Sequence, residues 1–328
     1  MNLVTGATGH IGNVLVRQLT AMGEKVRALV LPGEDKTPLM GLDVEIVEGD
    51  VLDYPSLFAA FRDIDTAFHL AGMISILPDK NLLVQSVNVA GTRNVLLAAR
   101  QAGTGRLIYT SSIHALRRIP HGAIIDETVP FDPQNAISTY DRSKAEASLE
   151  VMRAIQEGMD AVICCPTGVI GPYDFRGSEM GILIHDLALR KLMLYVDGAY
   201  DFVDVRDVAN GLILAREKGV TGESYILSGE QITVIDVVRT VQEIIGKYIP
   251  RIKIPFNLAR FTSRFTPLYY QISREKPRFT SYSLETIRSN SMISCAKAKS
   301  ALGYNPRSLR ESLADTVHWF LKEKSLVS

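Results

Sequence analysis

Apolar and polar residues follow two different spacings along the first half of the chain. Short apolar runs of strand length are separated by longer segments in which apolar residues recur every three or four positions, as on one face of a helix. Residues 10–22 show the helical spacing and are followed by Gly23, a common helix end. The pattern predicts strands at 1–4, 25–31, 44–50, 65–72, 106–112 and 160–168, and helices at 10–22, 55–62, 81–102 and 140–157.

This alternation of strands and helices predicts an α/β fold with a doubly wound parallel sheet. Each strand–helix–strand unit makes a right-handed crossover, so that helices cover both faces of the sheet. In such sheets ligands bind beside the carboxyl ends of the strands.

The composition narrows the classes of partner. The 328 residues are 46% hydrophobic and 22% charged, as in globular proteins. Lysine plus arginine balances aspartate plus glutamate at 36 each, which argues against general binding to nucleic acid or acidic membranes, though not against a local basic patch. We therefore expect a small-molecule substrate and no nucleic acid partner, and a homodimer is left open.

The chain also lacks sequence features of membrane insertion, secretion and metal binding. No apolar run reaches the roughly 18 residues of a membrane helix, and we expect no secretory signal. Cys164, Cys165 and Cys295 fit neither a zinc pattern nor a disulfide framework. A cytoplasmic protein without a metal site is expected.

A glycine-rich run, TGATGHIG at residues 5–12, follows the first strand and opens the first helix. That context favours a phosphate-binding turn. Gly6 would permit the tight turn, Gly9 the approach of a pyrophosphate, and Gly12 close packing of the helix on the sheet. The helix N-terminus would add free N–H groups and partial positive charge.

Two further motifs carry acid–base chemistry. The fifth strand ends in YTSS at 109–112, and YDRSK at 140–144 opens a helix. Tyr140 and Lys144 are four residues apart and share one helix face. A nearby ammonium would lower the pKa of the tyrosine from about 10. Ser112 would hydrogen-bond a substrate oxygen while Tyr140 gives or takes its proton.

Together these motifs resemble the extended branch of the short-chain dehydrogenase/reductase superfamily. Within it the chain is most similar to the dihydroflavonol-reductase-like and NAD-dependent epimerase/dehydratase-like proteins. The resemblance covers most of the chain and also includes GDVLD (49–53), HLAG (69–72), VNVAGTRNVLLAA (87–99), PTGVIGP (166–172) and DFVDVRDVANG (201–211).

The resemblance implies a Rossmann-type fold and assigns roles to individual residues. Ser112, Tyr140 and Lys144 would form a catalytic triad, with Asn88 as a fourth catalytic residue or a helix-kinking asparagine. The residues implied to bind the dinucleotide are Gly6, Thr8, Gly9, His10, Ile11, Gly12, Asp50, Val51, Leu70, Ala71, Gly72, Tyr140, Lys144, Pro166, Thr167 and Val169. His114 and Tyr173 are candidates for substrate contact.

Two domains are expected on the same basis. Residues 1–165, completed by a returning segment at about 203–227, would bind the dinucleotide. Residues 166–202 and 228–328 would form a smaller substrate-binding domain. Its aromatic-rich segment 254–270 is interpreted either as a lid over an apolar substrate or as domain core, with membrane-surface contact as a lesser alternative.

The cofactor is expected to be NAD or NADP. An acid at the end of the second strand selects NAD and an arginine there selects NADP, but Leu31 occupies this position. Glu34, Asp35 and Lys36 follow in what we interpret as a solvated turn. The absence of an acid at the selecting position favours NADP slightly.

The reaction expected is hydride transfer between the nicotinamide and a carbonyl or secondary alcohol of a non-nucleotide substrate. SSIHALRR lacks the Asp-Glu pair of the sugar-nucleotide dehydratases, and Ala199, Tyr200 and Asp201 stand where the epimerases usually place an arginine. A nucleotide-sugar epimerase acting through a transient ketone is the first alternative. A non-catalytic NAD(P)-binding redox sensor is the second.

Overall fold

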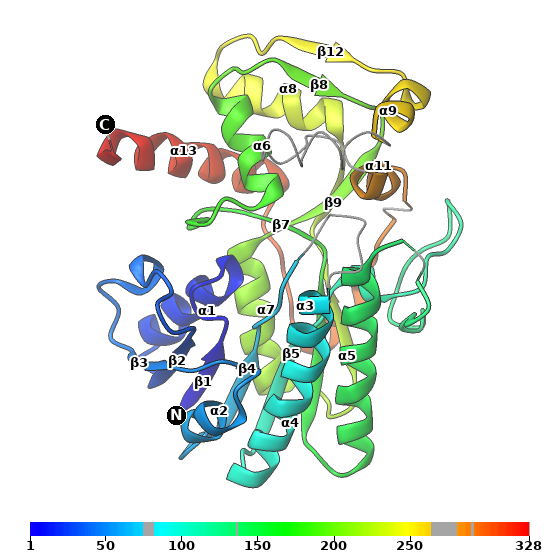
Figure 1. The fold of residues 1–328 in the computed structure, drawn as a ribbon. Helices are drawn as coiled ribbons and strands as arrows, with labels where there is room; N and C mark the ends of the chain where they lie inside the picture. The colour runs from blue at the N-terminus through cyan, green and yellow to red at the C-terminus, as the bar shows by residue number, and fades with distance from the viewer. Residues whose placement is uncertain (75–81, 136, 264–280, 290–291, 328) are drawn as a thin grey trace.

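The computed structural model describes residues 1–74, 82–135, 137–263, 281–289 and 292–327 (Figure 1). Among them, seven parallel strands form one sheet in the order β10-β6-β5-β4-β1-β2-β3. The strands are β1 (Asn2–Thr5), β2 (Val26–Val30), β3 (Glu45–Glu48), β4 (Thr66–His69), β5 (Arg106–Thr110), β6 (Ala161–Pro166) and β10 (Ser224–Leu227). The strand order reverses between β1 and β4, which confirms the predicted Rossmann-type sheet.

Helices cover both faces of this sheet because its strands are apolar on both sides. Leu3 points into one core and Val4 into the other, as the two-residue period of a strand requires. The Val4 side is covered by α1 (His10–Ala21), α7 (Val205–Lys218) and α12 (Ala296–Leu302). The Leu3 side is covered by α2 (Tyr54–Ala60), α4 (Gly91–Ala102) and α5 (Thr139–Gln156).

The helix predicted at 81–102 is interrupted near its start. It consists of α3 (Leu82–Gln85), a π-helical turn η2 (Ser86–Ala90) and α4. Asn88 lies within the π turn and is buried. Such turns often mark functional sites, and this one supports the kinking role implied for Asn88.

A second part of the molecule lies beyond the carboxyl ends of the strands. It contains β7 (Gly168–Ile170), α6 (Glu179–Ala188), β8 (Met193–Tyr195), β9 (Ala199–Asp204), β11 (Glu230–Thr233), α8 (Val234–Ile245), β12 (Arg251–Lys253), α9 (Phe256–Ser263), α11 (Ser281–Ile287) and α13 (Leu309–Val327). β9 pairs with β7 and β11, and β8 pairs with β12. Ile184, Val238 and Leu313 are among the side chains of its separate core.

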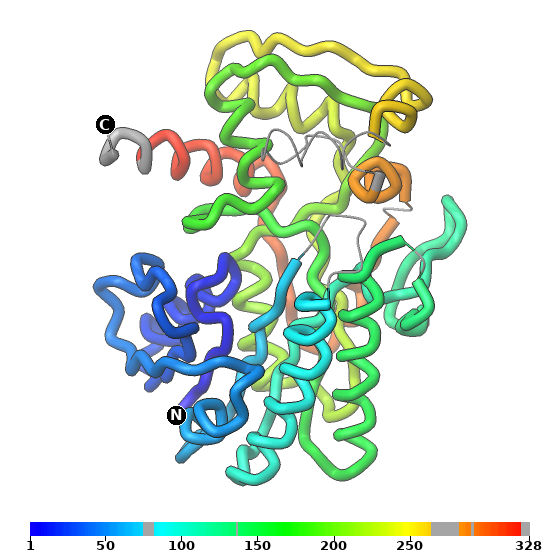
Figure 2. The backbone as a smooth tube through the Cα atoms, viewed as in Figure 1, coloured from blue at the N-terminus to red at the C-terminus, as the bar shows by residue number. Residues whose placement is uncertain are grey.

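The chain passes between the two parts several times (Figure 2). It leaves the large sheet after β6, returns from β9 into α7, leaves again after β10, and returns to α12 before α13. Cys295, Ala298, Leu302 and Tyr304 pack in the same core as Val4, although they fall within the range predicted for the substrate domain. The domain division itself stays a prediction.

Among the described residues, no helix is both long and apolar enough to cross a membrane. The described part of segment 254–270 includes α9, which packs Ala259 against Val196 and Leu284 and does not line the cavity described below. Residues 264–270 of the predicted lid lie outside the described residues.

Candidate active site

A cavity of about 990 Å³ opens where the two parts of the molecule meet. Its lower wall is formed by the carboxyl ends of β1, β4, β5 and β6 and by the start of α5. Its upper walls come from α6, β8, β9 and α11. The predicted site residues that line it are Gly6, Gly9, His10, Ile11, Gly12, Leu70, Gly72, Ser112, His114, Tyr140, Lys144, Pro166, Thr167 and Val169. One cavity therefore contains both the glycine run and the Ser-Tyr-Lys set.

The glycine run forms a turn that a larger residue would disrupt. Gly6 has φ +68°, and a Cβ there would lie 2.8 Å from the Ala71 nitrogen. A Cβ on Gly12 would lie 2.1 Å from the Gly6 carbonyl oxygen. Glycine is thus required at position 12 because the residue touches the Gly6 carbonyl within the turn. The sequence instead predicts that Gly12 is needed for close packing of the helix on the sheet. Gly9 is the N-cap of α1, and no side chain caps this helix start. Its first N–H groups can therefore bind an anion.

Ser112 and Tyr140 lie side by side at the cavity. Ser112 follows the end of β5 and accepts a hydrogen bond from the backbone N–H of His114 at 3.2 Å. Tyr140 is in the first turn of α5 and is mostly buried. Burial raises the pKa of Tyr140 to about 12, against the opposing effect of a hydrogen bond with the Ser112 side chain. The adjacent hydroxyls are suited to share one substrate oxygen.

Lys144 lies one helical turn further along α5. Its Nζ donates to the Thr110 carbonyl oxygen at 2.8 Å, and burial lowers its pKa to about 8. A Cβ on Gly72 would lie 3.4 Å from this Nζ, so glycine keeps β4 and the lysine close. Burial leaves the pKa of Tyr140 above its ordinary value in this structure, and the lowering by Lys144 expected from the sequence stays a prediction.

Asn88 joins the π turn to the end of β4 and to α5. Its Oδ1 accepts from the Met73 backbone N–H at 2.7 Å, and its Nδ2 donates to the Ser143 hydroxyl at 2.8 Å. Asn88 does not line the cavity. Its amide group holds backbone next to Gly72 rather than facing the site.

The other predicted residues outside the cavity lining have structural contacts. Asp50 accepts from the Leu52 backbone N–H at 2.9 Å, and buried Val51 packs against Gly91. The backbone N–H of Ala71 donates to Thr5 Oγ1 at 3.1 Å. The Tyr173 ring lies 4.6 Å from the Arg17 guanidinium, away from the cavity lining, so the geometry gives no support to its predicted substrate contact.

Sequence reasoning missed a bridge at the end of β2. Glu34 Oε2 accepts from the backbone N–H of Leu31 at 3.1 Å. A carboxylate therefore lies at the end of β2, although the residue at the selecting position is Leu31. Glu34 also pairs with Arg176, whose guanidinium donates to Thr8 Oγ1 at 2.7 Å. Glu34 is therefore not a freely solvated turn residue. Arg176 lies 142 positions away, and no local pattern links the two.

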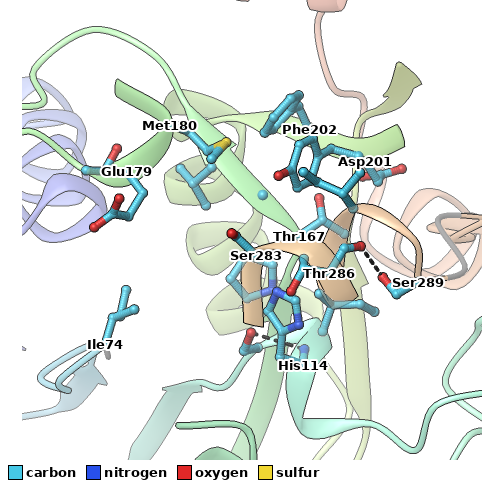
Figure 3. Close-up of a pocket in the computed structure, with 18 of the residues that line it drawn as sticks. Ile74, His114, Thr167, Glu179, Met180, Asp201, Phe202, Ser283, Thr286 and Ser289 are labelled. Carbon is cyan, nitrogen blue, oxygen red and sulfur yellow. Dashed lines mark hydrogen bonds between the residues drawn. The ribbon is translucent and has the colours of Figure 1, made fainter. Parts of the chain in front are cut away.

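A second missed contact holds α11 against the catalytic helix. Asp141, next to Tyr140, is fully buried and accepts from the Ser138 hydroxyl at 2.8 Å and from the Tyr282 hydroxyl at 2.9 Å. The Tyr282 ring lies 6.0 Å from the His114 ring. Figure 3 shows His114 beside Ser283 and Thr286 of α11, with Phe202 of β9 further up the cavity.

The upper walls are largely apolar. Met180, Leu183, Leu187, Met193, Tyr200 and Phe202 are among the lining side chains. Asp201 also lines the cavity, accepts from the Gly229 backbone N–H at 3.2 Å, and has its pKa raised to about 6 by burial. The lining includes Arg117 and Arg288 as well, and the Arg288 guanidinium lies 4.3 Å from the Phe256 ring.

Comparisons with known proteins show the family of the chain. The family model "NAD dependent epimerase/dehydratase family" matches residues 2–228. "Sterol demethylase protein B" of Methylococcus capsulatus is 37% identical, over 99% of both chains. "Putative dihydroflavonol 4-reductase" of Synechocystis is 34% identical, over 97% of this chain and 93% of that protein. The crystal structure of gox2253 superposes with a TM-score of 0.86 at 34% identity, over 98% of both chains. The chain therefore belongs to the NAD-dependent epimerase/dehydratase family, within the extended short-chain dehydrogenases and reductases.

Proposed function

We propose that the protein is an NAD(P)-dependent oxidoreductase that interconverts a carbonyl and a secondary alcohol on a bulky, apolar substrate. The observation that carries this proposal is the shared cavity, in which the glycine turn and the paired Ser112 and Tyr140 hydroxyls meet below apolar walls. The uncapped start of α1 and the tight Gly6–Gly12 contact fit the pyrophosphate of a dinucleotide.

The chain's own residues would perform the acid–base half of the reaction. When bound, the nicotinamide ring supplies or accepts the hydride. Ser112 donates a hydrogen bond that orients the substrate oxygen, and Tyr140 delivers a proton to that oxygen in reduction or removes it in oxidation. Lys144, held by the Thr110 carbonyl, would contact the cofactor ribose and add positive charge beside the phenol.

Replacement of Tyr140 by Phe tests this assignment. Tyr140→Phe should lower kcat by roughly 10²- to 10⁴-fold, because the proton is required in the transition state. Cofactor affinity should change little, since the ring remains in place. Turnover is followed at the nicotinamide absorbance and affinity by calorimetry. Near-full activity in Tyr140→Phe would remove the tyrosine from the mechanism.

The substrate class follows from the walls of the cavity. Met180, Leu187 and Phe202 of the upper walls offer apolar contact, while the lower part of the same cavity, at the glycine turn, would hold the dinucleotide. The name of the sterol-related relative is consistent with a large ring system. Sterol-type and long-chain secondary alcohols should therefore be turned over with higher kcat/KM than two- to four-carbon alcohols. The reverse order would contradict this class.

For the cofactor we propose a preference for NAD, although the sequence alone favours NADP slightly. The Glu34 carboxylate is held at the end of β2 by the backbone N–H of Leu31 and by Arg176, where its oxygens would accept from ribose hydroxyls. Glu34→Gln should reduce the ratio of NAD to NADP affinity by about tenfold. Glu48→Gln, which removes an exposed acid paired with Lys36, is the matched control. An unchanged ratio in Glu34→Gln would leave cofactor choice to other groups.

A nucleotide-sugar epimerase is the second candidate, because Arg117 and Arg288 line the cavity and a diphosphate requires such cations. With cofactor saturating, a nucleoside diphosphate would then raise the midpoint of thermal unfolding. A rise that is lost in Arg117→Ala or Arg288→Ala would favour the epimerase. No rise is expected if the substrate is apolar.

A further inference from the structure

Charge is distributed unevenly along this neutral chain. Residues 244–274 contain no aspartate or glutamate but include six basic residues: Lys247, Arg251, Lys253, Arg260, Arg264 and Arg274. The last two lie outside the described residues. They belong to the turn after α8, to β12 and to α9, at the end of the molecule farthest from the large sheet (Figure 1).

The helix α9 has two different faces. Its inner face packs Ala259 against Val196 and Leu284, and Leu284 belongs to the cavity-lining helix α11. On its outer face Leu258 is 53% exposed and Phe261 is 57% exposed. Residues three apart in a helix lie on one side, so the two form an apolar strip.

Two further large apolar side chains at this end of the molecule are exposed, one on β12 and one in the turn before it. Ile252 is 53% exposed and Tyr248 is 62% exposed. Exposed apolar residues of this size, together with the surplus of basic residues in the same segment, suggest an interaction surface. We call this group, made of Tyr248, Ile252, Leu258 and Phe261, the apical patch.

The charges around the apical patch are predominantly positive. Lys253 is neutralised by Asp197 at 2.6 Å. Arg251 lies 5.5 Å from the Tyr248 ring and hydrogen-bonds the Gln242 side chain, which is uncharged. Lys247 and Arg260 are exposed. The nearest acid on α8, Glu243, is paired with Arg310 at 2.6 Å.

We propose that the apical patch binds the surface of an anionic lipid membrane. Exposed apolar side chains mixed with basic residues fit the headgroup boundary of such a membrane. The position is also suited to an apolar substrate. Ile252 of β12 pairs with Leu194 of β8, which lines the cavity, so the patch is one strand away from the site.

Vesicle co-sedimentation of the full chain tests the proposal. The wild type should pellet with phosphatidylcholine vesicles that contain phosphatidylglycerol, and much less with phosphatidylcholine alone. Each basic residue near such a surface contributes roughly fivefold to binding. The double variant Lys247→Glu with Arg260→Glu should therefore reduce partitioning more than tenfold. Leu258→Ser should reduce it without changing net charge.

The double variant Lys25→Glu with Arg62→Glu is the matched control, because it makes the same charge change on exposed residues at the opposite end. It should pellet like the wild type. Equal loss in this control, no binding by the wild type, or a dimer in solution that Leu258→Ser dissociates would each overturn the proposal.

A failure of membrane binding can be distinguished from a failure of the proposed catalytic function. Activity of Lys247→Glu with Arg260→Glu on a water-soluble alcohol, measured without vesicles, should match that of the wild type. Unaltered thermal midpoints exclude misfolding. Vesicle binding by Tyr140→Phe should be normal even though its turnover is lost.

Discussion

At the scale of single residues, two buried aspartates differ in whether a nearby cation compensates their charge. Asp201 and Asp204 are both buried on β9, three residues apart. Asp204 is paired with Arg206 at 2.8 Å, and its pKa stays below the usual range despite burial, since hydrogen bonds and ion pairing with Arg206 outweigh desolvation. Within the described part of the chain no cation pairs with Asp201, and burial raises its pKa. The contrast indicates that Asp201 is retained at a cost in stability.

Asp201→Asn should therefore raise the free energy of unfolding at pH 7, by at most about 3 kcal/mol. The asparagine Oδ1 can still accept from Gly229, while the buried charge is removed. The pKa is about 6 in the folded state and near 3.8 when unfolded, so the folded protein binds more protons between these values. The difference from the wild type should thus shrink as pH falls through 6 and vanish below about 4.

Urea unfolding at pH 7 and pH 4 measures this effect. Asp204→Asn is the opposite control, because it breaks the ion pair with Arg206 and should destabilise the protein at pH 7. Destabilisation by Asp201→Asn at pH 7 would show that its carboxylate has a favourable partner.

The substitution Gly9→Val tests how much one residue of the turn contributes to cofactor binding. A Cβ at Gly9 would lie 3.2 Å from the Gly6 carbonyl oxygen, which is tight but needs little movement, whereas branched methyl groups would fill the space before α1. Dinucleotide affinity should fall by about tenfold or more, with a modest change in stability. Calorimetric titration of the folded variant checks this, and unchanged affinity would make the run an ordinary turn.

At the scale of elements, a buried hydrogen bond ties the wall helix α11 to the catalytic helix α5. Tyr282→Phe would remove the hydroxyl that donates to buried Asp141. Loss of one partner of a buried group costs about 1–3 kcal/mol. Because Ser283 and Thr286 line the cavity, KM for the substrate should rise severalfold while kcat changes less than twofold.

Steady-state kinetics with saturating cofactor separates these two parameters. Thr262→Val, which removes a hydroxyl bonded only within α9, is the matched control and should leave both unchanged. An equal fall in kcat for Tyr282→Phe would mean that the contact acts on Tyr140 rather than on the substrate wall.

At the scale of the whole molecule, the sequence predicts what local periodicity and short motifs encode. The alternation of strands and helices is sufficient to predict a sheet covered on both faces, and the spacing of Tyr140 and Lys144 places both on one helix face. The cluster around the cavity then follows from parallel strands ending together. Element ends differ by one to three residues, because capping groups such as Ser138 set them.

Contacts between distant segments could not be predicted in this way. The pairs Glu34–Arg176 and Asp141–Tyr282 are separated by 142 and 141 positions, and each joins a loop or helix start to the second part. In neither pair does the local sequence around one residue point to the other. Only the packing of the two parts brings them together, so the Glu34–Arg176 bridge and the contact that holds α11 are visible in the structure alone.

A fragment of residues 1–228 should not fold to a native-like state, although it contains the whole family match. It would lack Ala298, Leu302 and Tyr304, which complete the core beside α7, and Arg307, which pairs with Asp207 at 3.0 Å. Weak near-ultraviolet circular dichroism and non-cooperative urea unfolding are expected. A cooperative transition close to that of the full chain would contradict this dependence.

The repeated passage of the chain between its two parts has a consequence for proteolysis and for engineering. A single cut in any one connection leaves the halves tied by the others, so nicked protein should stay assembled under native conditions. Exchange of the upper part for another would require matched junctions after β6, before α7, after β10 and on both sides of α12. Substrate range is therefore more readily altered by substitutions in the cavity walls than by transplanting a module.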